Sequence, residues 1–206
     1  METINLSEGI GKSAIRAAGV LRQGGVVVYP TDTLYGLGVD AFSDEAVDKL
    51  YAIKGREPGK PTHCIVSDLA MAEEYAEVND AARKLAEKFL PGALTLILAK
   101  KPSLATGIGR GMDSIGIRIP NNEFCLEFAR TLGKPITTPS ANKAGVEPTT
   151  VPATILAQLG EENIDLFVDD GTLPPRQPST IVNLVSGSLS ILREGAVPSA
   201  EILAIR

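Results

Sequence analysis

The sequence has no tryptophan, one histidine and two cysteines, His63, Cys64 and Cys125. Two cysteines are too few for a disulfide framework, and the ligand spacings of protein-bound zinc sites need more histidines or cysteines than this. No apolar run approaches the roughly 18 residues that cross a bilayer. The N-terminus has no basic segment followed by an apolar stretch, so it does not read as a secretory signal. These absences predict a reduced, cytoplasmic protein with no membrane segment and no metal held by the protein itself.

The chain also lacks a basic surplus. Its 206 residues carry a formal net charge of −5, whereas proteins whose main function is to bind nucleic acid usually carry excess Lys and Arg that neutralise phosphates. The charge balance argues against nucleic-acid binding as the main function. It leaves room for a local basic cleft.

The residues for common nucleophilic sites are missing as well. His63 lies inside a strand-like run, which favours a structural imidazole over a catalytic base. Cys64 and Cys125 fit small buried apolar positions. We therefore expect any enzymatic chemistry to depend neither on a covalent intermediate nor on zinc.

Length and periodicity predict one α/β domain spanning residues 1–206. Short apolar runs alternate with helical patterns. Helices are expected at 11–23, at 44–54 with Gly55 as terminator, near 82–89 after an Asp80 cap, at 124–132, from Pro152, and at the C-terminus. Strands are expected at 25–29, 63–67, 94–99, 114–119, 134–138, 166–170 and in a hairpin formed by 179–185 and 189–193 around Ser186-Gly187. The predicted architecture has three layers around a twisted mixed sheet.

The segment PTDTLYGLG, residues 30–38, follows a predicted buried strand. Strand ends are the usual place for ligand sites in open α/β sheets. Thr31, Asp32 and Thr33 offer short hydrogen-bonding side chains, and Gly36 allows close backbone approach. An ordinary capped turn would explain the same residues.

The segment KGREPGKP, residues 54–61, concentrates positive charge in an acidic protein. Lys54, Arg56 and Lys60 can converge on one anion, with arginine as a planar fork and lysine as a point charge. A triphosphate is the obvious partner, and a solvated basic loop is the alternative.

Two further segments carry small polar side chains. Ser140 and Asn142 lie in TTPSANKAG, a loop bounded by proline and glycine that can bind phosphate or ribose. Ser179 and Arg193 lie on adjacent predicted strands, in PSTIVNL and ILREG. Spacing does not decide whether Arg193 forms a surface ion pair or a phosphate contact.

Together these segments resemble the YrdC family, the threonylcarbamoyl-AMP synthases. The matching elements are PTDTLYGLG, K-x-R at 54–56 followed by Lys60-Pro61, PGALTLIL, SIGIRIP, S-x-N at 140–142, PSTIVNL and ILREG. They occur in family order from about residue 12 to 197, which is nearly the whole chain.

The resemblance implies a YrdC-like fold with a large, positively charged cleft. It implies binding of L-threonine, bicarbonate and ATP, with Mg²⁺ carried by the ATP. The activity implied is a nucleotidyltransferase reaction that yields threonylcarbamoyl-AMP and pyrophosphate. The product would pass to a threonylcarbamoyl-transferase complex that modifies tRNA to threonylcarbamoyladenosine, and contact with tRNA would be indirect or weak, through the basic cleft.

Roles are carried across by position. The resemblance implies catalytic roles for Lys54, Arg56, Ser140 and Asn142. It implies that threonine is bound by Thr33, Arg118, Thr138 and Ser179, and that ATP is surrounded by Lys54, Arg56, Lys60, Ser114, Ser140, Asn142 and Arg193.

One departure concerns the amino acid. Many family members have P-L-I-V-H after the basic loop, with a histidine that touches threonine, and Ile65 occupies that position here. The stretch HCIVSDLA is similar instead to the YciO branch. Two alternatives stay open: a double-stranded-RNA-binding or ribosome-associated protein with little synthase activity, and adenylation of a different carbamate or carboxylate.

Overall fold

The computed structural model of the chain describes residues 1–57, 59, 61–185 and 189–205. The helices are α1 Ile10–Arg22, α2 Asp44–Lys54, α3 Leu69–Tyr75, α4 Asp80–Phe89, α5 Glu123–Leu132, α6 Pro152–Leu159 and α7 Ser199–Leu203, with 3-10 turns at Leu6–Glu8, Gly107–Gly109 and Glu161–Asn163. The strands are β1 Glu2–Asn5, β2 Val27–Pro30, β3 Tyr35–Gly38, β4 His63–Ile65, β5 Leu94–Ala99, β6 Ser114–Arg118, β7 Ile136–Thr137, β8 Leu166–Asp169, β9 Thr180–Asn183 and β10 Ser190–Arg193.

Capping residues explain why the best-predicted helices begin and end where they do. The Ser43 side chain accepts a hydrogen bond from the Ala46 amide at the start of α2, and Gly55 ends that helix with a φ of 60°. Only glycine adopts this left-handed conformation without strain. At α4 the prediction was wrong by one residue, because Asn79 is the cap and Asp80 is the first helical residue.

The strands form two mixed sheets. The first has the order β1-β8-β2-β3, and the second has the order β10-β9-β5-β6-β4-β7. The antiparallel pair β9–β10 confirms the expected strand pairing, and the Ser186-Gly187 turn predicted between them lies outside the described residues. The expected mixed α/β domain is confirmed, with its strands divided between two sheets.

The two sheets meet beside β3. Single bridges join Gly36 to Ser140 and Asp40 to Ile136, so the second sheet approaches the first without a continuous ladder. β7 is only two residues long and pairs with β4. The sequence interpretation took 30–38 as a ligand-site segment after a buried strand, with a capped turn as the alternative. It did not predict the strand β3, which residues 35–38 form against β2.

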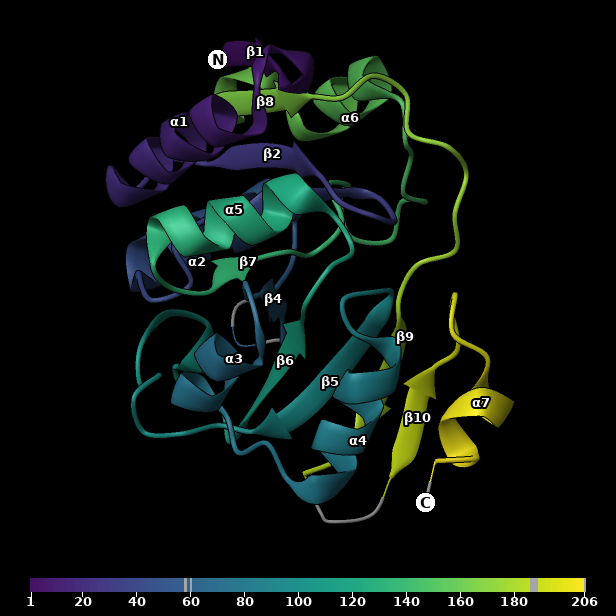
Figure 1. Cartoon of the computed structure of the whole chain (residues 1–206). Coiled ribbons are helices and arrows are strands. Elements are labelled where there is room, and N and C mark those ends of the chain that lie inside the picture. The colour runs from purple at the N-terminus through teal and green to yellow at the C-terminus, as the bar shows by residue number, and fades with distance from the viewer. Residues whose placement is uncertain (58, 60, 186–188, 206) are drawn as a thin grey trace.

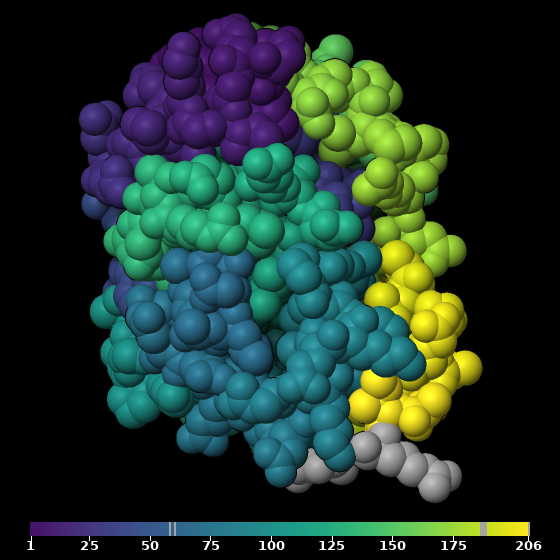
Figure 2. Space-filling view, in the orientation of Figure 1, coloured from purple at the N-terminus to yellow at the C-terminus, as the bar shows by residue number. Residues whose placement is uncertain are grey.

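Helices cover the sheets from both sides (Figure 1). α1 and α5 pack side by side over the first sheet, and one face of the molecule shows them next to α3 and α4 (Figure 2). Small residues on α1, among them Ala14, Ala17 and Ala18, are fully buried in the same apolar cluster as Phe124 and Phe128 of α5. Close packing of these helices on the sheet holds β2 in place, and β2 leads into the pocket described below.

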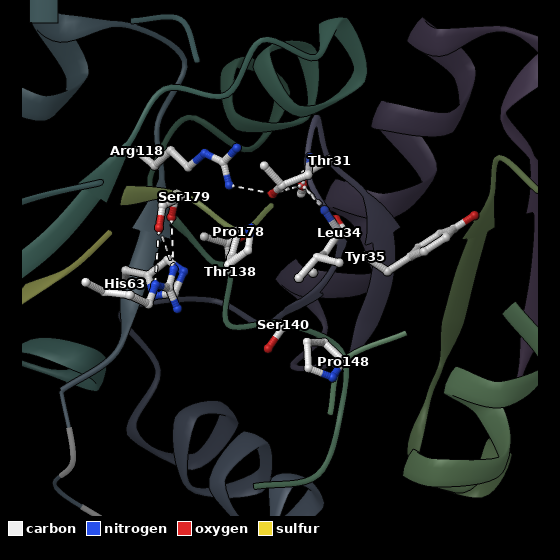
Figure 3. Close-up of a pocket in the computed structure, with 13 residues that line it drawn as sticks. Thr31, Leu34, Tyr35, His63, Arg118, Thr138, Ser140, Pro148, Pro178 and Ser179 are labelled. Carbon is white, nitrogen blue, oxygen red and sulfur yellow. Dashed lines mark hydrogen bonds between the residues drawn. The ribbon is translucent and has the colours of Figure 1, made fainter. Parts of the chain in front are cut away.

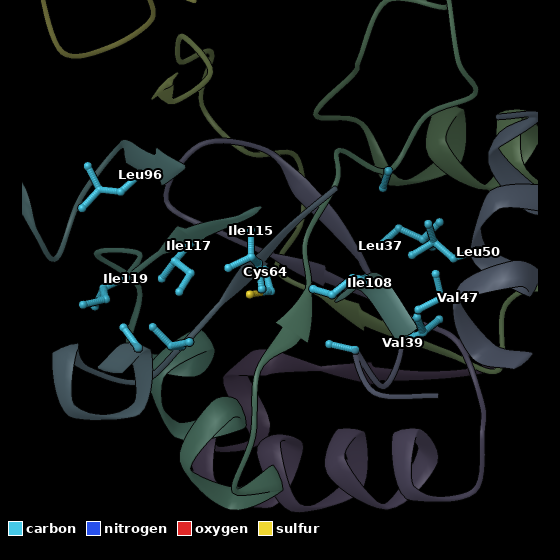
Figure 4. Packing of buried hydrophobic residues seen from close by; sticks show 14 of the residues in the cluster. Leu37, Val39, Val47, Leu50, Cys64, Leu96, Ile108, Ile115, Ile117 and Ile119 are labelled. Atoms are coloured by element: carbon cyan, nitrogen blue, oxygen red, sulfur yellow. The ribbon is translucent and has the colours of Figure 1, made fainter. Parts of the chain in front are cut away.

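A second apolar cluster fills the other side. Leu37 and Val39, from β3 and just after it, pack near Val47 and Leu50 of α2 (Figure 4). The same cluster continues under the second sheet through residues such as Ile117. Within the described part of the chain, no helix is both long and apolar enough to cross a membrane.

Candidate functional site

A pocket of about 320 Å³ opens where the two sheets meet (Figure 3). Its walls come from segments far apart in the sequence: the turn after β2, the starts of β3 and β4, the end of β6, the loop after β7, the two residues before β9, and the end of β10. Six residues predicted for ligand binding line it: Thr33, Arg118, Thr138, Ser140, Ser179 and Arg193. The structure therefore brings together residues that span 160 positions of sequence, from 33 to 193.

Arg118 and the turn after β2 form one wall of the pocket. The guanidinium donates to the Thr33 hydroxyl at 2.9 Å, to Asp32 Oδ1 at 2.6 Å and to the Gly92 carbonyl at 3.1 Å. The second Asp32 oxygen accepts from the Asn121 amide at 3.1 Å. Both side chains of the Arg118–Asp32 ion pair are over 90% buried. This pair fixes the turn and neutralises its own charge.

Ser179 and Arg193 form a neighbouring wall. The Ser179 hydroxyl lies 2.9 Å from that of Thr95, and Arg193 donates to the Ser179 carbonyl at 2.7 and 3.2 Å and to its hydroxyl at 3.3 Å. Burial and the nearby Arg118 lower the pKa of Arg193. Arg193 makes no ion pair with a carboxylate among the described residues, so its charge is available to an anion.

Lys54 lies beneath the 140–142 loop. Its ammonium donates to the carbonyls of Ser140 at 2.5 Å and Asn142 at 2.6 Å. The Asn142 side chain accepts from the Ser140 hydroxyl and donates to the Val146 carbonyl, both at 2.5 Å. Of the predicted pair, Ser140 faces the pocket, whereas Asn142 and Lys54 hold the loop in shape.

Desolvation and the charge of Arg56 lower the pKa of Lys54 to about 8. The ammonium is nonetheless the form that donates well to two carbonyl oxygens. Lys54 is thus a cation just behind the pocket wall, and its charge is present at neutral pH.

The remaining predicted nucleotide contacts do not line this pocket. Arg56 is half-buried beyond α2 and donates to the Pro61 carbonyl at 2.6 Å. Lys60 lies outside the described residues. Ser114 begins β6, four residues before Arg118, so about 13 Å of strand separates them. ATP contacts by these residues stay predictions.

His63 is a polar pocket residue that sequence reasoning did not assign to the site. It was interpreted as a structural imidazole, and the structure places its side chain in the pocket wall. Desolvation, helped by the charges of Arg118, Arg193, Arg56 and Lys54, lowers its pKa to about 3. Ile65, two residues along β4, is fully buried among apolar side chains and brings no polar group to the pocket.

Cysteine chemistry is unsupported. Burial raises the pKa of Cys64 to about 12 and raises the pKa of Cys125, so both thiols stay protonated. Within the described residues, no group of His, Cys, Asp and Glu side chains is arranged to hold a metal ion. The polar side-chain groups that line the pocket are hydroxyls, guanidinium groups and one neutral imidazole.

Gly36 lets β3 pass close to the pocket wall, and this can be tested. A Cβ at this position would lie 2.9 Å from Thr138 Oγ1 and 3.1 Å from the buried Tyr29 ring. Gly36→Ala is expected to lower the free energy of unfolding by about 1–3 kcal/mol in urea denaturation, because the Tyr29 ring cannot move away. Gly19→Ala on α1 is the matched control, since nothing lies within 4 Å of its Cβ; it should be neutral or slightly stabilising. Equal effects of the two changes would contradict the account of Gly36.

Comparison with known proteins agrees with this geometry. The family model described as "Telomere recombination", which groups Sua5, YciO and YrdC, matches residues 19–195. The chain belongs to the Sua5/YciO/YrdC family. A family member from Methanocaldococcus jannaschii is 42% identical over 176 residues, which are 85% of this chain and 82% of that protein. The threonylcarbamoyl-AMP synthase of Pyrococcus abyssi is 34% identical over 201 residues, which are 97% of this chain and 59% of that protein.

Solved structures of Sua5/YciO/YrdC members share the fold. P. abyssi Sua5 in complex with L-threonine aligns with a TM-score of 0.90 at 30% identity, over 99% of this chain and 60% of that one. YciO from E. coli aligns with a TM-score of 0.85 at 27% identity, over 96% of each chain. The chain therefore spans about three fifths of the P. abyssi protein and nearly all of YciO.

Proposed function

We propose that this chain is an L-threonylcarbamoyladenylate synthase. It would form threonylcarbamoyl-AMP and pyrophosphate from L-threonine, bicarbonate and ATP, a nucleotidyltransferase reaction. The observation that carries the proposal is the single pocket that joins the Thr33–Arg118 turn and Ser179 to the Ser140 loop and Arg193. Relatives named threonylcarbamoyl-AMP synthase and the threonine complex of P. abyssi Sua5 support it.

The proposed chemistry needs no nucleophile from the protein. The threonine amine forms a bond to the carbon of carbon dioxide derived from bicarbonate and loses a proton, which gives a carbamate. A carbamate oxygen then attacks the α-phosphorus of ATP, and the bond from that phosphorus to the bridging oxygen breaks to release pyrophosphate. The pocket is compatible with this demand, because its imidazole is a very weak base and both cysteines of the chain are buried and protonated.

The protein's task would be to hold two anions that repel each other. Arg118 is already neutralised by Asp32, which suits the end that receives a zwitterionic amino acid. Arg56 and Arg193 form no ion pair with a carboxylate among the described residues, which suits the end that receives the triphosphate. Mg²⁺ would arrive on the phosphates of ATP and supply further positive charge to the leaving pyrophosphate.

The test is to incubate the purified chain with ATP, Mg²⁺, bicarbonate and each amino acid in turn, and to measure pyrophosphate release. We expect release that requires both threonine and bicarbonate, and a product with the mass of threonylcarbamoyl-AMP. No threonine-dependent pyrophosphate above background would refute the proposal. Pyrophosphate release with a different amino acid, and not with threonine, would support adenylation but would show that threonine is not the substrate.

One alternative stays open, binding of double-stranded RNA through Arg56 and Arg193, which form no ion pair with a carboxylate among the described residues. An ATP-inert chain that binds an RNA duplex with a steep salt dependence would support it. If the synthase proposal holds, the product would pass to a threonylcarbamoyl-transferase complex acting on tRNA, in the cytoplasm.

A further inference from the structure

His63 occupies a position that the fold has prepared for it. It is the first residue of β4 and lies in register with Gly116 of β6, while the Thr138 amide donates to its carbonyl at 3.0 Å. A Cβ at Gly116 would come within 2.7 Å of the His63 Cβ, so the histidine packs over a residue that has no side chain. Its imidazole lies in the pocket wall beside Ser179 (Figure 3).

The imidazole is not used inside the protein. Neither ring nitrogen has a hydrogen-bond partner among the described residues, and the residue is only partly buried. This contrasts with the other polar groups of the pocket, since Arg118, Thr33 and Ser179 all bond to protein atoms. A polar ring that lines a pocket and has no protein partner is available to a ligand.

The ring is also neutral. Desolvation and the surrounding charges of Arg118, Arg193, Arg56 and Lys54 hold its pKa near 3, and among the described residues no carboxylate lines the pocket. The Asp32 carboxylate is next to Thr33 in the sequence, but it already accepts hydrogen bonds from Arg118 and from the Asn121 amide. One nitrogen of a neutral imidazole is an acceptor. In a pocket lined by the guanidinium groups of Arg118 and Arg193, His63 offers a neutral nitrogen acceptor.

We propose that His63 orients the amino-acid substrate by accepting a hydrogen bond from its amino nitrogen. The inference rests on the proposed function and names the group that would recognise the reacting atom. A carboxylate in this place would hold the amine as an ammonium ion, which has no lone pair to offer carbon dioxide. A neutral imidazole accepts an N–H and stabilises that charge much less than a carboxylate does. His63 is therefore an orienting group and does not act as the base.

The lone histidine makes a direct test possible. The full chain is labelled with ¹⁵N-histidine, so the only imidazole signals belong to His63, and its spectra are recorded from pH 5 to 8.5. We expect a neutral ring throughout this range and a saturable change in the ring nitrogen shifts on adding L-threonine. 3-Hydroxybutyrate, which lacks the amino group, should leave these shifts unchanged.

Two results would overturn the inference while leaving the synthase proposal intact. One is threonine binding, measured by calorimetry, with no change at the His63 nitrogens. The other is an identical change with 3-hydroxybutyrate. Absence of any threonine binding by calorimetry would instead refute the proposed function, and the inference with it.

Variants separate recognition from a structural role. His63→Leu removes the acceptor, and we expect KM for threonine to rise about five- to tenfold, the effect of one lost hydrogen bond, with KM for ATP unchanged. His63→Gln keeps an acceptor oxygen and should retain part of the threonine affinity. A parallel rise in both KM values, or identical behaviour of the two variants, would show that the histidine only shapes the pocket.

Discussion

Replacing Arg118 with methionine is expected to lower the free energy of unfolding by about 3–5 kcal/mol and to abolish threonine binding. The change leaves the Asp32 carboxylate buried without its cation and removes the donor that positions the Thr33 hydroxyl. Urea denaturation measures the first effect, and calorimetry with threonine measures the second.

Two controls make that result interpretable. Arg83→Met breaks a surface ion pair with Glu73 and should cost less than about 1 kcal/mol, because exposed pairs contribute little. Adding Asp32→Asn to Arg118→Met removes the orphaned charge and should restore part of the lost stability without restoring threonine binding. A loss below about 1 kcal/mol for Arg118→Met would contradict the burial of this pair.

Lys54→Met is the second large change. We expect the Kd for ATP to rise about 10- to 100-fold, because two charge-assisted hydrogen bonds to the 140–142 loop are lost together with a buried positive charge. Arg56→Ala, which removes only a half-buried side chain bonded to the Pro61 carbonyl, should raise it less. Lys12→Met, on the exposed side of α1, is the matched control and should leave ATP binding unchanged. Unaltered ATP affinity in Lys54→Met would remove the loop from the nucleotide site.

The pKa of Lys54 near 8 predicts two opposite trends with pH. Between pH 8 and the ordinary lysine value of 10.5, the folded chain releases the Lys54 proton while the unfolded chain keeps it. The contribution of this residue to stability should therefore rise with pH in that window. ATP affinity should fall over the same window, because a cation is lost. Denaturation and ATP titrations of parent and Lys54→Met chains check both trends, and the variant should lack them.

Much of the fold could be predicted because local signals agree with it. For α2, the Ser43 cap, the acidic first turn and the Gly55 stop all indicate the same boundaries, and the structure has them. β5 coincides with six residues, Leu94–Ala99, of which five are apolar and Thr95 is the exception, and this is the pattern of a buried strand. In both cases the deciding chemistry lies within a few residues of sequence.

β3 could not be predicted in this way. Gly36 and Gly38 have low strand propensity, and the strand exists because β2 pairs with it and because the Tyr29 ring fills the space that side chains would occupy. The division into two sheets has the same origin, since only isolated bridges link β3 to the residues around β7. Tertiary contacts decide these features.

In the candidate site, too, some residues could be predicted from the sequence and others depend on tertiary contacts. Family pattern identified Thr33, Arg118, Thr138 and Ser179, and the structure places all four in one pocket. It did not indicate that Lys54 faces the back of the Ser140 loop. His63 was not assigned to the site because a histidine inside a strand-like run favours a structural imidazole, although residues two apart on a strand share a face and the family pattern had marked position 65.

The hydrogen bonds that anchor the 139–142 loop lower the entropy cost of binding a ligand at that end of the pocket. The Leu37 amide donates to the Pro139 carbonyl, the Ala141 amide donates to the Tyr35 carbonyl, and Lys54 binds the loop from behind. These bonds form when the chain folds, so the conformational entropy of the loop is lost then and not at each encounter with a ligand. The Ser140 end of the pocket is preorganised, and its selectivity would come from a rigid shape that a ligand must fit.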